Sequence, residues 1–168
     1  LGISLNVTDC ESINNLVEKV LQNFGKVDIL INNAAINDMV ESPKSILNES
    51  KFENYSLANW QKSIDVNLTG TFLCSQIIGK EMVKQKSGNI INIASTYGIV
   101  APNQSLYKDK NGKQTFFKPP AYSVTKGAII SFTKYLAAYW ADKNIRVNSL
   151  SPGGVKNNQN KNFIKEYS

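Results

Sequence analysis

The chain has 168 residues, of which 42% are hydrophobic and 19% are charged, and its formal net charge is +6. This length is about one domain and the composition suits a packed core, which excludes the disordered class. The chain contains no histidine. Ser-His-Asp catalysis, Cys-His catalysis and most zinc sites are therefore excluded, because each needs an imidazole, and we expect no metal.

Charge and cysteine usage limit the partners and the compartment. The lysines are scattered rather than clustered, so no basic stripe with interleaved aromatic residues is present and we expect no nucleic-acid partner. No apolar run reaches the ~18 residues of a membrane span, and nothing resembles a signal peptide. Cys10 and Cys74 fit neither a disulfide framework nor a metal-ligand spacing. We therefore expect no membrane contact and a cytoplasmic location.

The first predicted elements are a strand, a helix and a second strand. Residues 2–7 are predicted to form a short strand, and Thr8 and Glu11 have the spacing of a capping box that starts a helix. Apolar residues then recur at helical spacing until Gly25, which is placed to end the helix. Residues 27–31 are nearly all apolar and rich in β-branched side chains, which is typical of a strand buried on both faces.

The rest of the chain continues the alternation. Residues 36–55 are polar and irregular, with a short helix predicted near residues 45–47. Ser56 is the predicted N-cap of a long helix that ends before Gly88. The remaining predictions are a buried strand over residues 89–94, a helix from residue 122 and a strand over residues 145–150.

Strands that alternate with helices of this length predict an α/β fold. The connections would be right-handed crossovers, giving a Rossmann-like, doubly wound parallel sheet with helices on both faces, in one domain over residues 1–168. Ligands of such sheets bind beyond the carboxyl ends of the strands. Polar or turn-forming residues follow three predicted strands there, at Asn32-Asn33-Ala34-Ala35, at Ser95 and at Pro152-Gly153-Gly154.

The segment Tyr122-Ser123-Val124-Thr125-Lys126 places a tyrosine and a lysine on one helix face. A phenol ordinarily loses its proton near pH ~10, so a phenolic base needs a neighbouring positive charge, and Lys126 can supply it. Tyr139 and Lys143 repeat the spacing, and we interpret that second pair as a solvated helix edge. The spacing alone is therefore weak, and other segments must support it.

With these positions in place, the chain resembles the short-chain dehydrogenase/reductase family from Leu1 to about Val155. Asn32-Asn33-Ala34-Ala35 is similar to the family's Asn-Asn-Ala-Gly strand end, beside the adenosine half of the cofactor. Four positions correspond to the family's catalytic residues, namely Asn67 within Asp65–Gly70, Ser95, Tyr122 and Lys126. The resemblance implies an NAD(P)-dependent oxidoreductase that transfers a hydride between NAD or NADP and an alcohol or carbonyl substrate.

The resemblance also implies a role for each residue. Ser95 would bind the substrate oxygen, Tyr122 would be the acid/base, and Lys126 would favour the phenolate and hold the nicotinamide ribose. Asn67 would position a water that connects Lys126 to solvent. The helices containing Asn67 and Tyr122 would pair with those of another copy in a homodimer or homotetramer. The implied cofactor-binding residues are Asn6, Val7, Asn33, Ala34, Ala35, Tyr122, Lys126, Pro152, Gly153 and Val155.

Each of these residues also has a simpler explanation. Asn67 could hydrogen-bond a helix irregularity, Ser95 could end a strand, and Pro152-Gly153 could be a turn. The competing function is a catalytically silent scaffold or partner-binding protein on the same fold. The family's glycine-rich phosphate loop and its C-terminal substrate segment have no counterpart here, so we expect a domain truncated at both ends. Asn6 stands where the family often has aspartate, and Asn157 where it has threonine.

The loop over residues 96–121 is longer than the family norm, with an insertion at residues 103–118. Asn111-Gly112 is the signal of a tight hairpin. Because both ends of the loop adjoin catalytic positions, we expect it to border the substrate entrance; a solvated surface excursion is the alternative. Deletion of residues 108–114 would change the substrate KM in the first case. The insertion resembles family members of bacterial surface-glycan biosynthesis, which implies a sugar or sugar derivative as substrate.

Overall fold

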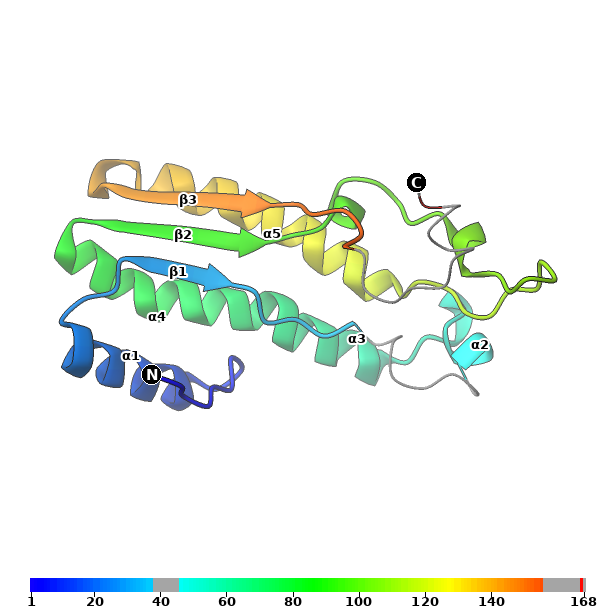
Figure 1. Cartoon of the computed structure of the whole chain (residues 1–168), viewed down its shortest axis with the longest axis horizontal. Coiled ribbons are helices and arrows are strands. Elements are labelled where there is room, and N and C mark those ends of the chain that lie inside the picture. Colours follow the sequence, from blue (N-terminus) through cyan, green and yellow to red (C-terminus); the bar gives the residue numbers. More distant parts are fainter. Residues whose placement is uncertain (38–45, 156–166, 168) are drawn as a thin grey trace.

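The computed structural model describes residues 1–37, 46–155 and 167 (Figure 1). Three parallel strands form one sheet in the order β1-β2-β3, and the register aligns Leu30 with Ile90 and Ile90 with Val147. The predicted parallel sheet is confirmed. The strands are β1 (Ile29–Asn32), β2 (Gly88–Ile93) and β3 (Ile145–Leu150).

The long helices in the described residues share one face of the sheet. Figure 1 shows α4 and α5 running behind the three strands, with α1 beside α4. Successive right-handed crossovers that step in one direction along a sheet place their helices on the same face. The helices are α1 (Cys10–Phe24), the short α2 (Ile46–Glu49), α3 (Leu57–Ser63), α4 (Gly70–Gln85) and α5 (Pro120–Tyr139).

One hydrophobic core lies between these helices and the sheet. Ile90 and Val147 face it from the strands, Met82 from α4 and Ile13 from α1, and all four are at most 7% exposed. The other face of β1 is open, because Ile29 and Ile31 are each 57% exposed. The prediction that β1 is buried on both faces is therefore wrong for the described residues. No helix in the described ranges is both long enough and apolar enough to cross a bilayer.

Residues 2–7 do not form the predicted strand. A strand needs a hydrogen-bonded neighbour, and no described strand pairs with this segment. The backbone of Asn6 bonds locally instead, donating to Ser12 Oγ at 3.0 Å and accepting from Asp9 N at 3.2 Å. Val7 packs against Gly70, where a Cβ would lie 2.7 Å from Val7 Cγ2. The segment therefore covers the start of α4.

The helix boundaries follow local capping chemistry. Asp9, rather than the predicted Thr8, is the N-cap of α1, because its carboxylate accepts from Glu11 N at 2.9 Å. Thr8 instead donates from its hydroxyl to Asn6 Oδ1. Gly25 ends α1 in the left-handed conformation with φ of 75°, as predicted.

The helix from Ser56 is interrupted by a π-helical segment, Ile64–Thr69, between α3 and α4. The Ser56 hydroxyl accepts from Asn59 N at 3.2 Å, which confirms the predicted N-cap. The last helix, α5, begins at Pro120 and not at Tyr122. A proline fits the first helical position because the backbone N–H it lacks has no helical partner there.

Candidate active site

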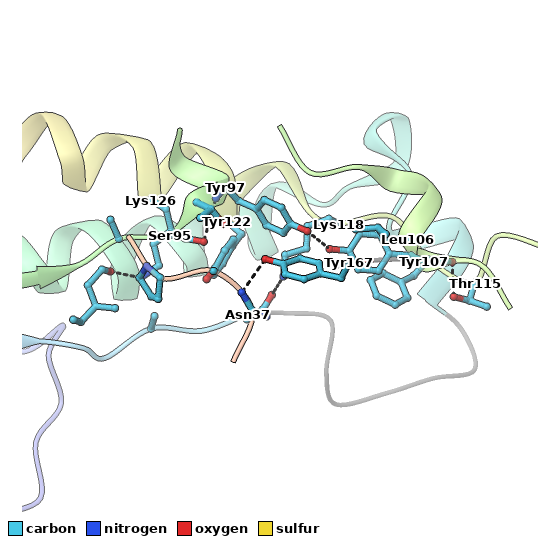
Figure 2. Close-up of a pocket in the computed structure, with 18 of the residues that line it drawn as sticks. Asn37, Ser95, Tyr97, Leu106, Tyr107, Thr115, Lys118, Tyr122, Lys126 and Tyr167 are labelled. Carbon is cyan, nitrogen blue, oxygen red and sulfur yellow. Dashed lines mark hydrogen bonds between the residues drawn. The ribbon is translucent and has the colours of Figure 1, made fainter. Parts of the chain in front are cut away.

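A pocket of about 760 Å³ lies where the carboxyl ends of the three strands meet the start of α5 (Figure 2). Asn33 and Ala35 line it after β1, and Ser95 lines it after β2. The chain brings these residues together because the connections of a parallel sheet return to the same edge. The other predicted site residues that line the pocket are Pro152, Gly153, Tyr122 and Lys126.

Lys126 is the buried cation of this pocket. It lies one turn after Tyr122 on α5, and its side chain is 4% exposed. The Nζ donates to the carbonyl oxygen of Ile93, the last residue of β2, at 2.6 Å, and lies 5.8 Å from the centroid of the Tyr122 ring. Burial lowers the pKa of the Lys126 ammonium below its ordinary value, because the charged form loses hydration.

Ser95 is held by a short turn that packs against α5. Its Oγ accepts from Tyr97 N at 3.2 Å and caps the 3₁₀ turn Thr96–Gly98, which leaves the hydroxyl hydrogen available to an acceptor in the pocket. The turn ends at Gly98, where a Cβ would lie 2.6 Å from the carbonyl carbon of Lys126 and 2.8 Å from the nitrogen of Gly127. Only a glycine at residue 98 permits this approach of the turn to the backbone of α5.

Asn67 supports the site from behind the pocket. It is 0% exposed and lies in the π-helical segment. Its Oδ1 accepts from Ile36 N at 2.8 Å, and its Nδ2 donates to Ile36 O at 3.1 Å and to Thr125 Oγ1 at 3.3 Å. The side chain therefore connects the segment after β1 to α5, next to Lys126. Its role in a proton relay stays a prediction.

Four of the predicted cofactor residues do not line this pocket, namely Asn6, Val7, Ala34 and Val155. The Oδ1 of Asn6 already accepts from both the backbone and the hydroxyl of Thr8. Val155 is 74% exposed. The contact expected from Asn157 lies outside the described residues.

The sequence analysis missed Lys118. Its Nζ lies 4.3 Å from the centroid of the Tyr122 ring and donates to Asn37 Oδ1 at 2.7 Å. Figure 2 shows Lys118 and Lys126 on opposite sides of Tyr122. A signal was present in the sequence, because Lys118, Tyr122 and Lys126 follow one another at intervals of four residues.

The long loop before α5 forms the outer part of the pocket. It contains a hairpin in which Lys108 bridges to Gln114 and Gly112 has φ of 76°. Tyr107 is 9% exposed, and its hydroxyl lies 3.3 Å from that of Tyr97. Burial and this hydrogen bond raise the pKa of Tyr107 far above its usual range, so it stays a phenol. Further lining residues of the loop are Leu106, Asp109, Lys110, Thr115 and Phe116.

The sequence and the fold of the chain are similar to those of known proteins. A family model described as enoyl-(acyl carrier protein) reductase matches residues 1–167. The 3-oxoacyl-[acyl-carrier-protein] reductase of Synechocystis sp. is 33% identical over 167 residues, which are 99% of this chain and 58% of that protein. Glucose 1-dehydrogenase 2 of Bacillus subtilis is 32% identical over an alignment of 169 positions, which covers 100% of this chain and 57% of that protein.

A solved structure extends the likeness to three dimensions. The crystal structure of a short chain dehydrogenase from Leptospira borgpetersenii with bound NAD+ is 34% identical to this chain and superposes with a TM-score of 0.80. The match covers 98% of this chain and 58% of that one, so the chain spans less than two thirds of the length of these relatives. Fold, strand-end residues and sequence similarity agree, and the chain belongs to the short-chain dehydrogenase/reductase family.

Proposed function

We propose that the protein is an NAD(P)-dependent oxidoreductase that interconverts an alcohol and a carbonyl compound. One observation carries the proposal: Ser95, Tyr122 and Lys126 line one pocket at the carboxyl edge of the sheet. A scaffold would not need a serine hydroxyl, a phenol and a buried ammonium to face one cavity. The burial of the Lys126 ammonium costs folding free energy, and buried charges with a shifted pKa cluster at functional sites.

The roles follow from the geometry of each side chain. Ser95 donates its hydroxyl hydrogen to the substrate oxygen, because its Oγ already accepts from Tyr97 N. Tyr122 gives a proton to that oxygen during reduction and removes it during oxidation. Lys126 supplies the positive charge that favours the phenolate during the proton transfer. Asn67 keeps the segment after β1 in place through its two hydrogen bonds to Ile36.

The residues around Lys126 suit a nicotinamide cofactor. An ammonium has three N–H donors, and Lys126 gives one to Ile93 O, so further donors are available for ribose hydroxyls. Asn33 and Ala35 line the pocket after β1, and Pro152 and Gly153 line it after β3. NAD or NADP would supply the hydride, and the chain would orient it and hold the proton. The similar structure with bound NAD+ supports this choice.

A sugar or sugar derivative is our proposed substrate, including those of surface-glycan biosynthesis. The similarity to a glucose dehydrogenase supports it. The lining supports it as well, because hydroxyl, amide and charged side chains such as Tyr97, Asn37 and Lys118 alternate with aromatic rings. Such a lining can hydrogen-bond several hydroxyls at once.

The test is the change in nicotinamide absorbance in protein made from the full reading frame, with each cofactor and a panel of sugars, polyols and ketones. We expect turnover by the wild type and a loss of about 10²- to 10⁴-fold in kcat for Tyr122→Phe, because the proton donor is removed. Tyr139→Phe is the matched control. It removes the hydroxyl of the second tyrosine with a lysine four residues later, but Tyr139 is 63% exposed and outside the pocket.

Equal loss in the two variants would contradict the role of Tyr122. No turnover with any substrate, together with no binding of NADH, would contradict the oxidoreductase and favour the scaffold.

We further propose that the protein pairs with itself through the outer face of α4 and α5. Phe72 on α4 is 41% exposed, and Tyr135 and Tyr139 on α5 are 61% and 63% exposed. Together with Phe132 and Trp140 they line a second hollow between the two helices. Large exposed apolar patches mark association surfaces. Sedimentation should give a dimer or tetramer that Tyr135→Glu weakens, whereas a monomeric wild type would contradict the pairing.

A further inference from the structure

We propose that Tyr97 and Tyr107 together recognise a hydroxyl of the substrate that lies away from the reacting carbon, and so make the enzyme selective for polyhydroxylated substrates over simple alcohols and ketones. This inference rests on the proposed function, because it names the substrate class of the same pocket. Its basis is a pair of phenol hydroxyls, 3.3 Å apart, on two residues that both line the pocket of Ser95 and Tyr122.

Tyr97 ties this hydroxyl pair to the catalytic end of the pocket. It lies on the short turn that follows Ser95, and its backbone N–H donates to Ser95 Oγ at 3.2 Å. In Figure 2 its side chain points away from Ser95 towards Tyr107. One turn therefore carries both the Ser95 hydroxyl and the Tyr97 hydroxyl, with a spacing set by the length of a tyrosine side chain. A substrate with oxygens at both ends of that spacing is held at both.

Tyr107 is supplied by the long loop before α5 and is fixed there. Its carbonyl oxygen accepts from Thr115 N at 2.9 Å and from Thr115 Oγ1 at 2.7 Å. Its ring packs on that of Phe116 with ring centroids 4.5 Å apart, and the residue is 9% exposed. Because both its backbone and its ring are held, Tyr107 keeps the Tyr97 hydroxyl in a preorganised position, and binding a ligand there costs less side-chain entropy.

The chemistry of the pair favours a ligand that can both donate and accept. The contact with Tyr107 is the one hydrogen bond that the Tyr97 hydroxyl makes in the described part of the chain, and either phenol can be its donor. If Tyr97 donates, its oxygen can still accept from the ligand; if Tyr107 donates, Tyr97 can give its own hydrogen to the ligand. A ligand hydroxyl fits both arrangements. A ligand with a methyl group there desolvates the phenol without bonding to it, so the site discriminates against it.

The experiment measures binding by calorimetry to the full-length protein, with and without NADH, using matched pairs of probes of increasing length. Each pair compares a linear polyol, from glycerol to D-glucitol, with the vicinal alkanediol of the same carbon number. The diol keeps a hydroxyl for Ser95 and lacks the distant ones. The variants are Tyr97→Phe and Tyr107→Phe, which keep the rings and remove one hydroxyl each, and Tyr139→Phe, which removes a hydroxyl outside the pocket as a control.

We expect the wild type and Tyr139→Phe to bind at least one polyol about 10-fold more tightly than its diol. Tyr97→Phe should lose about 10-fold in affinity for that polyol and nothing for the diol, as expected for one hydrogen bond. Tyr107→Phe should lose part of the same preference, because Tyr97 then lacks the partner that orients it. The length of the polyol that responds gives the distance of the recognised hydroxyl from the reacting carbon. Equal affinities within every pair, or an unchanged preference in Tyr97→Phe, would overturn the proposal.

Kinetics separate this inference from the proposed function. If Tyr97 binds substrate, Tyr97→Phe raises KM for the polyol and leaves kcat for the diol unchanged, because the variant keeps the backbone N–H that donates to Ser95. If the Tyr97 hydroxyl acts only through the turn of Ser95, kcat falls for the polyol and the diol alike, which overturns the proposal while the oxidoreductase stands. Failure of the oxidoreductase itself is seen separately, as absence of NADH binding and turnover in the wild type.

Discussion

Lys126 donates from Nζ to the carbonyl oxygen of Ile93, 2.6 Å away, and so ties the second turn of α5 to the end of β2. The hydrogen bond aims a buried ammonium at the edge of the sheet where the pocket lies. The charge is desolvated there, and its pKa is lowered. Placing the cation therefore costs folding free energy near neutral pH, which makes the site measurable without a substrate.

The first prediction concerns this cost. Above the unfolded pKa of about 10.4 the lysine is neutral in both states and contributes nothing. As the pH falls from about 10.4 towards the lowered folded pKa, the unfolded state binds the proton before the folded state does, so the free energy of unfolding decreases. We expect the stability of Lys126→Met, relative to the wild type, to be greater at pH 7 than at pH 10. Urea unfolding at several pH values gives the difference.

The loss of the hydrogen bond to Ile93 O adds about 1–3 kcal/mol of destabilisation in the variant. This contribution does not depend on pH. The test is therefore the slope, that is, how the stability difference between the variant and the wild type changes with pH, and not its value at one pH. Lys134→Met, which changes an exposed lysine on the same helix, should give no such slope. A slope equal in both variants would contradict the assignment of the cost to Lys126.

Local signals in the sequence placed the candidate residues at one edge of the predicted sheet, and the family resemblance gave them their catalytic roles. Ser95 follows a strand of β-branched residues, and the loop after it leads to Tyr122 and Lys126, so the strand end and the loop predicted that these residues converge on one edge. Sequence patterns did not predict the contacts between segments that are far apart in the chain. Two such contacts are the approach of Gly98 to α5 and the position of Lys118 beside Tyr122. Both depend on how the loop before α5 folds back, and the spacing of apolar residues does not predict this.

The strand predicted over residues 2–7 was wrong for a related reason. Alternating apolar residues favour a strand, but a strand forms only beside a partner, and the described sheet provides none for this segment. The helix start was misassigned by one residue, because Thr8 and Asp9 are both good N-caps and Asp9 carries the stronger acceptor.

The second prediction tests the contact between Gly98 and α5. A Cβ at residue 98 would meet the carbonyl carbon of Lys126 at 2.6 Å and its oxygen at 2.7 Å, and backbone atoms of a helix cannot move aside. Gly98→Ala should therefore displace the turn that carries Ser95. We expect a loss of about 1–3 kcal/mol in stability and roughly 100-fold in kcat/KM. Gly2→Ala, where a Cβ meets nothing within 4 Å, should change neither.

The third prediction uses the two free cysteines. Cys10 is exposed, whereas Cys74 is 4% exposed and burial raises its pKa to about 11. The thiolate is the reactive species, and at pH 8 only about one in a thousand Cys74 side chains would carry it. We expect a disulfide reagent to label one thiol rapidly in the native protein and both in denaturant. Cys10→Ser should abolish the rapid phase; rapid labelling in that variant would show that Cys74 is accessible.

The last prediction concerns Asn67 and the backbone of Ile36. Asn67→Asp keeps the shape of the side chain and the acceptor for Ile36 N, but an ionised carboxylate cannot donate to Ile36 O and faces that oxygen with a negative charge. Burial and this repulsion would raise the folded pKa of the new carboxyl. The variant should therefore lose about 2–5 kcal/mol at pH 7 and recover part of it as the pH falls, because the protonated carboxyl can donate again.

Asn67→Leu is the matched comparison, because it removes both hydrogen bonds to Ile36 and the one to Thr125 and introduces no titratable group. It should be destabilised by a similar amount, with no recovery at low pH relative to the wild type. Urea unfolding of both variants between pH 5 and pH 8 measures the difference. If both variants stay within about 0.5 kcal/mol of the wild type, the hydrogen bonds to Ile36 do not hold the segment after β1. The support of the pocket by the π-helical segment would then have to come from its packing against α5 alone.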